Sequence, residues 1–245
     1  MLEYPASNLP TVPPSAENFR NGARNRGLGL EFVRQYTADD WDVFAACRDP
    51  SGATQLQQIA TRSGGRLTVV GMDVTAGESV GDVATQLGKV AIDLLINNAG
   101  ISGEPGQRTG NVDYENWARV LDANTIGPLR VIEAFVHIAR SQRRLIVTIT
   151  SGMGSLTDNT SGGSIAYRTS KAAVNMAMRS VAADLASRGI TCVVINPGWV
   201  RTTMGGASAP LTPEESAAAM RRLIGRLRPK DSGKFFNHDG REHPW

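Results

Sequence analysis

The stretch LIVTITSGMGSLTDNTSGGSIAYRTSK, residues 145–171, decides the fold. Its first six residues form an unbroken β-branched and aliphatic run, which is typical of a strand buried on both faces of a parallel sheet. A polar, glycine-rich segment follows. From about residue 165 the chain is rich in alanine and methionine up to Gly189, a natural helix stop. The stretch therefore predicts a buried strand, a loop and a long helix in succession.

Apolar runs and helical patterns alternate along the rest of the chain in the same way. Strands are predicted at 42–47, 67–72, 92–97, 145–150 and 191–196, with a short edge strand at 234–237. Helices are predicted at 29–36, 53–61, 78–87, 114–140, 165–188 and 213–227. This alternation predicts an α/β fold with a doubly wound, Rossmann-type parallel sheet, helices on both faces and ligands at the carboxyl ends of the strands.

Composition excludes several classes of protein. The formal net charge is only +3 and the arginines are scattered, which argues against a nucleic-acid or membrane partner. The two cysteines, Cys47 and Cys192, have neither metal-ligand nor disulfide spacing, so we expect no metal and a reducing, cytoplasmic location. No apolar run is long enough to span a bilayer, and the N-terminus lacks the features of a signal peptide.

Three residues of the opening stretch indicate proton-transfer chemistry. Ser151 lies at the carboxyl end of the predicted strand, and Tyr167 and Lys171 share one face of the predicted helix at positions i and i+4. An ammonium close to a phenol lowers the pKa of the phenol from about 10 toward working pH, as a general acid or base requires. The serine hydroxyl can polarise a carbonyl oxygen. A Tyr-x-x-x-Lys pair alone is a weak motif, and the strand-end serine supports it.

Further motifs stand in the same order as in a known family. With Ser151 and the Tyr-Lys pair, the chain resembles the short-chain dehydrogenase/reductases through Asn97-Asn-Ala-Gly100, Asn124 within Leu121-Asp-Ala-Asn-Thr-Ile-Gly127, and Asn196-Pro-Gly-Trp-Val-Arg-Thr202. Residues 155–160, 167–173 and 239–245 are similar to the C-factor-like and sniffer-type carbonyl reductases of that family. The resemblance runs from about Arg24 to the last residue.

The resemblance implies an oxidoreductase that transfers a hydride between the nicotinamide of NADP(H) and a carbonyl or secondary alcohol. Tyr167 would exchange the proton, Ser151 would bond the substrate oxygen, and Lys171 would assist Tyr167 and hold the nicotinamide ribose. Asn124 would seat a water in a proton relay, although a helical asparagine can also simply bond to backbone. The helices at 114–140 and 165–188 correspond to those that pair in dimeric relatives, which makes a homodimer possible.

The end of the second predicted strand indicates the cofactor. It reads Ala46-Cys47-Arg48, without the carboxylate that would bond the 2′-hydroxyl of NAD, and Arg26 supplies a second guanidinium for a 2′-phosphate. Asp49 could instead pair with Arg48 on the surface. The resemblance places Asp73 and Val74 at the adenine, Asn98 to Gly100 at the ribose and Thr202 at the carboxamide. The implied cofactor-binding set is Arg26, Gly27, Leu28, Gly29, Arg48, Asp73, Val74, Asn98, Ala99, Gly100, Tyr167, Lys171, Pro197, Gly198, Val200 and Thr202.

The N-terminus departs from the family pattern. Residues 1–21 form an atypical segment before a single domain at 22–245, and the prolines at 5, 10, 13 and 14 predict irregular backbone over 1–14. The first strand is therefore atypical or missing. The turn Gly22-Ala-Arg-Asn-Arg-Gly27-Leu-Gly29 also has one residue too many between its first two glycines. Either residues 19–23 form a poor substitute strand, or, as we favour, the first twenty-odd residues are not homologous to the family. A C-factor-like signalling or binding protein that binds cofactor poorly is the alternative function.

Two loops and three apolar side chains indicate the class of substrate. Residues 103–111 and 199–211 are rich in Gly, Ser and Pro, and we expect both to border the pocket as mobile lids. Met153, Trp199 and Met204 would give the pocket an apolar lining, which favours a hydrophobic aldehyde or ketone. Trp199 could equally pack against the core.

Overall fold

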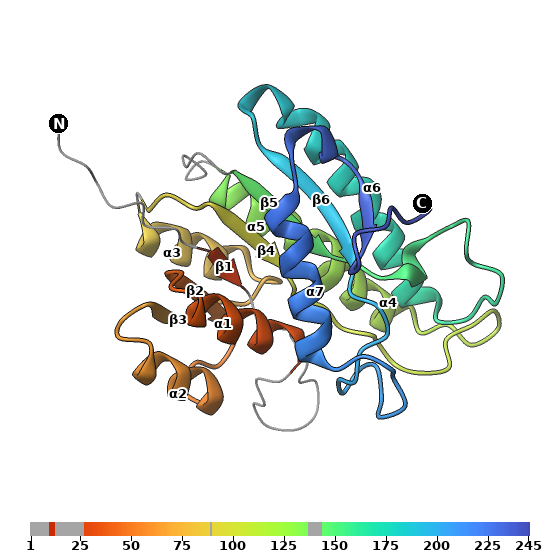
Figure 1. Cartoon of the computed structure of the whole chain (residues 1–245). Helices are drawn as coiled ribbons and strands as arrows, with labels where there is room; N and C mark the ends of the chain where they lie inside the picture. Colours follow the sequence, from red (N-terminus) through yellow and green to blue (C-terminus); the bar gives the residue numbers. More distant parts are fainter. Residues whose placement is uncertain (1–9, 13–26, 89, 137–143) are drawn as a thin grey trace.

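A parallel sheet runs through the computed structural model, which describes residues 10–12, 27–88, 90–136 and 144–245 (Figure 1). Within these ranges seven strands pair in parallel in the order β3-β2-β1-β4-β5-β6-β7. In chain order they are β1 (Pro10–Val12), β2 (Val43–Cys47), β3 (Leu67–Gly71), β4 (Leu94–Asn97), β5 (Leu145–Ile149), β6 (Thr191–Asn196) and β7 (Phe235–Asn237). Every predicted strand is present, and the predicted edge strand is β7, which ends the sheet.

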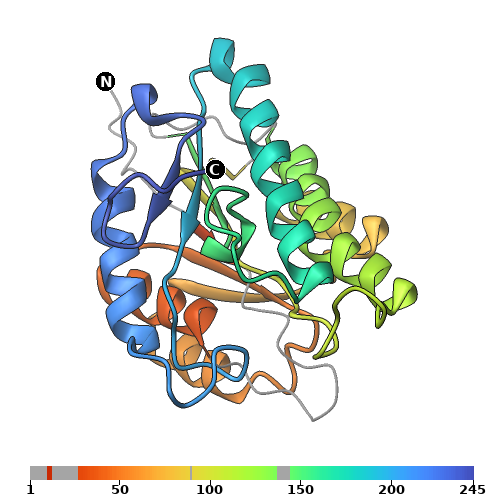
Figure 2. The same cartoon turned by 90° about the vertical axis from the view of Figure 1, so that its right-hand side faces the viewer.

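Helices cover both faces of this sheet, as predicted (Figure 2). The helices on one face are α1 (Leu28–Ala38), α2 (Thr54–Arg62) and α7 (Pro213–Arg226). Those on the other face are α3 (Gly77–Leu87), α5 (Gly127–Phe135) and α6 (Ile165–Asp184). Within β5, Val147 packs in the core beneath α1, α2 and α7, and Ile146 packs in the core beneath α3, α5 and α6. Both side chains are at most 2% exposed. Because successive strand residues face opposite ways, burial on both faces explains the unbroken apolar run.

The long helix predicted at 114–140 contains a wider turn. It begins as α4 (Tyr114–Leu121), passes through the π-helical segment η1 (Asp122–Ile126) and continues as α5; residues 137–140 lie outside the described part. One inserted residue hardly alters the apolar pattern, so the sequence predicted a regular helix. Single π-helical turns often mark functional positions.

In the described ranges, no helix combines the length and apolarity that crossing a membrane requires.

The centre of the sheet corrects one prediction. Residues 1–14 were expected to be irregular, but β1 lies between β2 and β4, with Thr11 paired to both Phe44 and Leu95. A proline is tolerated as the first residue of a strand because its missing N–H costs least there. The two neighbouring strands, of five and four residues, each offer ladder groups to a short extended segment between them. The first strand is thus present but only three residues long, which is atypical, and residues 19–23 lie outside the described part.

Removing one amide from β1 tests this pairing. Thr11→Pro should lower the free energy of unfolding by about 3 kcal/mol, because proline cannot donate to the ladder of a central strand. Thr11→Val keeps the amide and is the matched control. The measurement is urea unfolding followed by circular dichroism, and equal midpoints for the two variants would contradict the central position of β1.

Candidate active site

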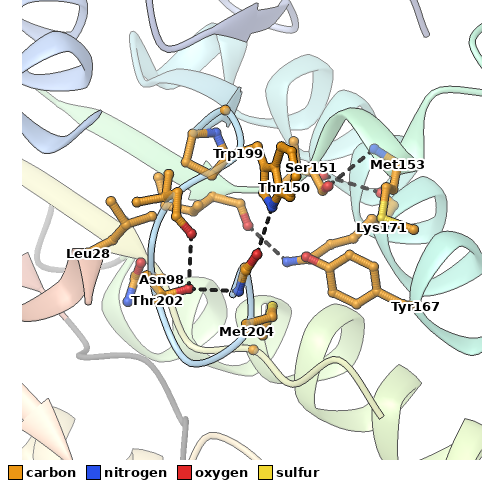
Figure 3. Close-up of a pocket in the computed structure, with 16 residues that line it drawn as sticks. Leu28, Asn98, Thr150, Ser151, Met153, Tyr167, Lys171, Trp199, Thr202 and Met204 are labelled. Carbon is orange, nitrogen blue, oxygen red and sulfur yellow. Dashed lines mark hydrogen bonds between the residues drawn. The ribbon is translucent and has the colours of Figure 1, made fainter. Parts of the chain in front are cut away.

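A cavity of about 230 Å³ opens where β4, β5 and β6 end (Figure 3). The predicted site residues that line it are Leu28, Asn98, Gly100, Ser151, Tyr167, Lys171, Pro197, Gly198, Val200 and Thr202. Met153, Trp199 and Met204 also line it, as expected of an apolar wall. Sequence motifs missed Ile149 and Thr150, whereas Gly205 belongs to the loop 199–211 that was expected to border the pocket. The position of Ile149 and Thr150 directly before Ser151 was the signal that could have found them.

Ser151 is held by the turn that follows β5. Its side-chain oxygen accepts the Met153 N–H at 3.1 Å as the cap of the short 3₁₀ turn η2 (Gly152–Gly154). The turn lies close to α6, since a Cβ built on Gly154 would lie 2.8 Å from the carbonyl carbon of Lys171. Only glycine permits this approach. The serine hydroxyl keeps its own proton to donate toward the cavity.

Tyr167 and Lys171 reach the same cavity from α6 (Figure 3). The Lys171 Nζ lies 5.7 Å from the centre of the Tyr167 ring and donates to the Ile149 carbonyl oxygen at 3.1 Å. Lys171 is only 5% exposed, and burial lowers its pKa from the ordinary 10.5 to about 8. A buried cation therefore lies beside the phenol, as the i, i+4 spacing predicted.

Asn124 lies behind the cavity, in the π-helical segment. Its side chain accepts the Ile101 N–H at 2.8 Å and donates to the Ile101 carbonyl oxygen at 2.8 Å and the Ser170 hydroxyl at 2.9 Å. Both amide donors are thus in use, and the backbone-bonding alternative describes this side chain. A Cβ on Gly100 would lie 3.0 Å from the Asn124 Oδ1, so Asn124 supports the turn after β4 from behind.

The described residues at the start of α1 and after β4 fit a dinucleotide. Gly27 caps α1 with φ +82°, and within the described ranges no side chain caps the helix, so its first amides suit an anion. Leu28 lines the cavity and Gly29 follows it in the helix. The Nδ2 of Asn98, which lines the cavity, is buried with no hydrogen-bond partner in the described ranges. Such an orphaned donor fits a ligand rich in hydroxyl oxygens. Arg26 lies outside the described residues.

The other predicted cofactor residues lie along the same edge of the sheet but outside the cavity. Arg48 is exposed directly after β2, and Asp73 follows β3, where its carboxylate accepts the Thr75 N–H at 2.9 Å. Val74 packs against Gly127, whose Cβ would lie 2.9 Å from it, and Ala99 packs against the core.

Asp49, the alternative partner of Arg48, bonds within its own turn. Its carboxylate accepts from the Ser51 hydroxyl at 2.6 Å and the Gly52 N–H at 3.0 Å. These hydrogen bonds lower the pKa of Asp49. The carboxylate thus serves this turn, which follows β2.

One of the two expected lids borders the cavity. Trp199 is 57% exposed, and its indole N–H donates to the Gly205 carbonyl oxygen at 2.7 Å, so the ring lies over the cavity and does not pack into the core. The expectation for residues 103–111 is wrong for the described cavity, which they do not line. Gly103 is pressed against α4 instead, since a Cβ there would lie 2.7 Å from Asn116 Oδ1. Sequence composition does not show such anchoring.

The buried ammonium predicts a specific dependence of stability on pH. The unfolded chain keeps the Lys171 proton up to about pH 10.5, whereas the folded chain keeps it only up to about pH 8. The contribution of this group to stability therefore rises with pH between these two values, and it is lost again as pH falls back to about 8. Relative to Lys171→Met, the wild type should gain about 3 kcal/mol between pH 8 and 10.5. Urea unfolding across this range measures the gain. Lys230→Met is the matched control at an exposed lysine, and a difference from Lys171→Met that does not change with pH would contradict the prediction.

Comparison with known proteins places the chain in a family. The model of a family described as short chain dehydrogenase matches residues 22–210. The C-signal protein of Myxococcus xanthus is 46% identical over 163 residues, which cover 66% of this chain and 98% of that protein. The structure of carbonyl reductase Sniffer of D. melanogaster has a TM-score of 0.86 at 28% identity, covering 98% of this chain and 99% of that one. NADPH-bound carbonyl reductase from chicken fatty liver has a TM-score of 0.87 at 32% identity, covering 97% and 94%. The chain therefore belongs to the short-chain dehydrogenase/reductase family of oxidoreductases, in its carbonyl reductase branch.

Proposed function

We propose that this protein is an NADP(H)-dependent reductase of carbonyl compounds, with Ser151, Tyr167 and Lys171 as its catalytic residues. The observation that carries the proposal is that these three side chains line one cavity at the carboxyl ends of the central strands. A buried lysine beside a tyrosine is costly for stability and useful for proton transfer.

Each residue has one task in the proposed reaction. When bound, the nicotinamide supplies the hydride that forms the new C–H bond at the substrate carbonyl carbon. Tyr167 donates its hydroxyl proton to the carbonyl oxygen as the C=O π bond breaks, which gives an alcohol. Ser151 donates a hydrogen bond to the same oxygen, and the Lys171 ammonium favours the phenolate left on Tyr167. Asn124 remains a proposed member of a proton relay, and it also supports the turn after β4 from behind.

We assign the cofactor to the carboxyl edge of the sheet. The amides at the start of α1, at Gly27, Leu28 and Gly29, suit the pyrophosphate, and Arg48 with Arg26 suits a 2′-phosphate. A short-chain dehydrogenase/reductase from Burkholderia multivorans was solved with bound NADP, and the chicken fatty liver carbonyl reductase with NADPH, which supports the phosphorylated form. The remaining proposed contacts are Asp73 and Val74 to the adenine, Asn98, Ala99 and Gly100 to the ribose, and Pro197, Gly198, Val200 and Thr202 to the nicotinamide.

The proposed substrate is a hydrophobic aldehyde or ketone. Met153, Trp199 and Met204 border the cavity, and Trp199 offers a ring whose N–H is already bonded. Apolar and aromatic walls favour substrates without charge near the carbonyl.

We also propose a homodimer that forms through the helices α4, α5 and α6. Ile126, in the π-helical segment between α4 and α5, and Met176, in α6, are exposed apolar side chains that such an interface would cover.

Cofactor titration is the first test of the proposal. Purified full-length protein should bind NADPH more tightly than NADH, and Arg48→Ser should weaken NADPH binding by roughly tenfold while changing NADH binding little, because only NADPH carries the 2′-phosphate. Quenching of tryptophan fluorescence measures both affinities. Lack of binding to either nucleotide would favour the alternative of a signalling or binding protein.

Loss of one hydroxyl tests the catalytic assignment. Tyr167→Phe should reduce turnover of hydrophobic aldehydes and ketones by a factor on the order of 10² or more, because the ring remains but the proton donor is gone. Affinity for NADPH should change little. A screen that follows NADPH absorbance measures turnover, with Tyr114→Phe, on an exposed tyrosine, as the matched control. Retention of most activity in Tyr167→Phe would remove the tyrosine from the mechanism.

A further inference from the structure

Two active-site turns and the C-terminal segment meet at the side chain of Asn196, the last residue of β6. Its Oδ1 accepts the Gly198 N–H at 3.2 Å. Its Nδ2 donates to the Oδ1 of Asn237, the last residue of β7, at 2.8 Å. One side-chain amide thus joins the turn that begins at Pro197 to the edge strand of the sheet.

The same amide also touches the turn that carries Ser151. A Cβ built on Gly152 would lie 3.2 Å from the Asn196 Nδ2 and 3.3 Å from the His243 Nε2. Both distances are tighter than ordinary van der Waals contact, so Asn196 and His243 leave little room for a side chain at the residue after Ser151. Asn196 therefore bounds the space on one side of the serine turn.

The C-terminal segment is well anchored and can serve as a fixed support. The His243 N–H donates to the Phe235 carbonyl oxygen at 2.7 Å, and the Trp245 carbonyl oxygen accepts from the Thr157 N–H at 3.0 Å. Figure 2 shows this dark blue segment beside the green loop that follows β5. The support is therefore tied to the sheet and to the loop after Ser151.

We propose that Asn196 is a positioning residue for carbonyl reduction and that Asn237 is its anchor. Asn196 places the Pro197–Thr202 segment through the Gly198 amide and places Ser151 through Gly152. Neither asparagine lines the cavity, so both act through other residues. The inference rests on the proposed function, because it assigns a purpose to the positions of Ser151 and of the nicotinamide contacts.

The chemistry of the contact suggests a sharp test. An amide pair needs one donor and one acceptor. Asn196→Asp can still accept from Gly198 and from the amide of Asn237 once that amide rotates, and Asn237→Asp can still accept from Asn196. The double variant Asn196→Asp/Asn237→Asp leaves two carboxylates facing each other without a donor, and their like charges repel.

The experiment compares the two single variants with the double variant. Each single variant should keep kcat within about threefold of wild type, whereas the double variant should lose at least about tenfold in kcat with a smaller change in KM, because a displacement of about 1 Å can cost about a hundredfold in rate. NADPH oxidation with the best carbonyl substrate of the wild type is the assay, and thermal melting shows that each variant is folded at the assay temperature. Asn159→Asp, on an exposed loop, is the matched control.

The possible outcomes separate the inference from the proposed function. A folded double variant with wild-type kcat would overturn the inference. If the double variant does not fold, Asn237→Ala replaces it, and an unchanged kcat there would overturn the inference equally. A wild type that neither binds NADPH nor reduces any carbonyl would overturn the proposed function, and the inference with it.

Discussion

Close packing between α6 and the turn after β5 is the contact on which the site depends. Gly154 leaves no space for a side chain against the backbone of Lys171. This approach lets the Lys171 ammonium reach the Ile149 carbonyl oxygen at 3.1 Å and brings Ser151 to the same cavity as Tyr167. A larger residue at 154 would separate strand end from helix, and the three side chains would no longer meet.

The burial of Lys171 lowers the stability of the fold and places a charge where proton transfer would need it. An ammonium that is 5% exposed loses most of its hydration, and the lowered pKa of about 8 reports that cost. A methionine at this position would serve packing better. Buried charges of this kind are common at functional sites, where a desolvated charge is needed for the chemistry. Packing elsewhere in the core must offset the stability that is lost at the site.

The sheet around the site is unevenly built. Strands β4, β5 and β6 have four, five and six residues and are almost fully buried, whereas β1 contributes only three residues to the middle of the sheet. The substrate half of the site is built on the strong strands. The proposed cofactor phosphates would bind at the start of α1, which contacts β1, so we expect cofactor affinity to be the property most sensitive to this short strand.

The sequence by itself determined the strands from β2 to β7, the helices on both faces and the pairing of Tyr167 with Lys171. These follow from local periodicity, because apolar runs and i, i+4 spacing express geometry within one element. Tertiary structure alone decided the place of β1, since a three-residue segment that begins with proline has no periodic signal and pairs only because β2 and β4 flank it. It also decided the contact of Asn196 with Asn237, 41 residues away, because such contacts depend on how turns approach one another in space.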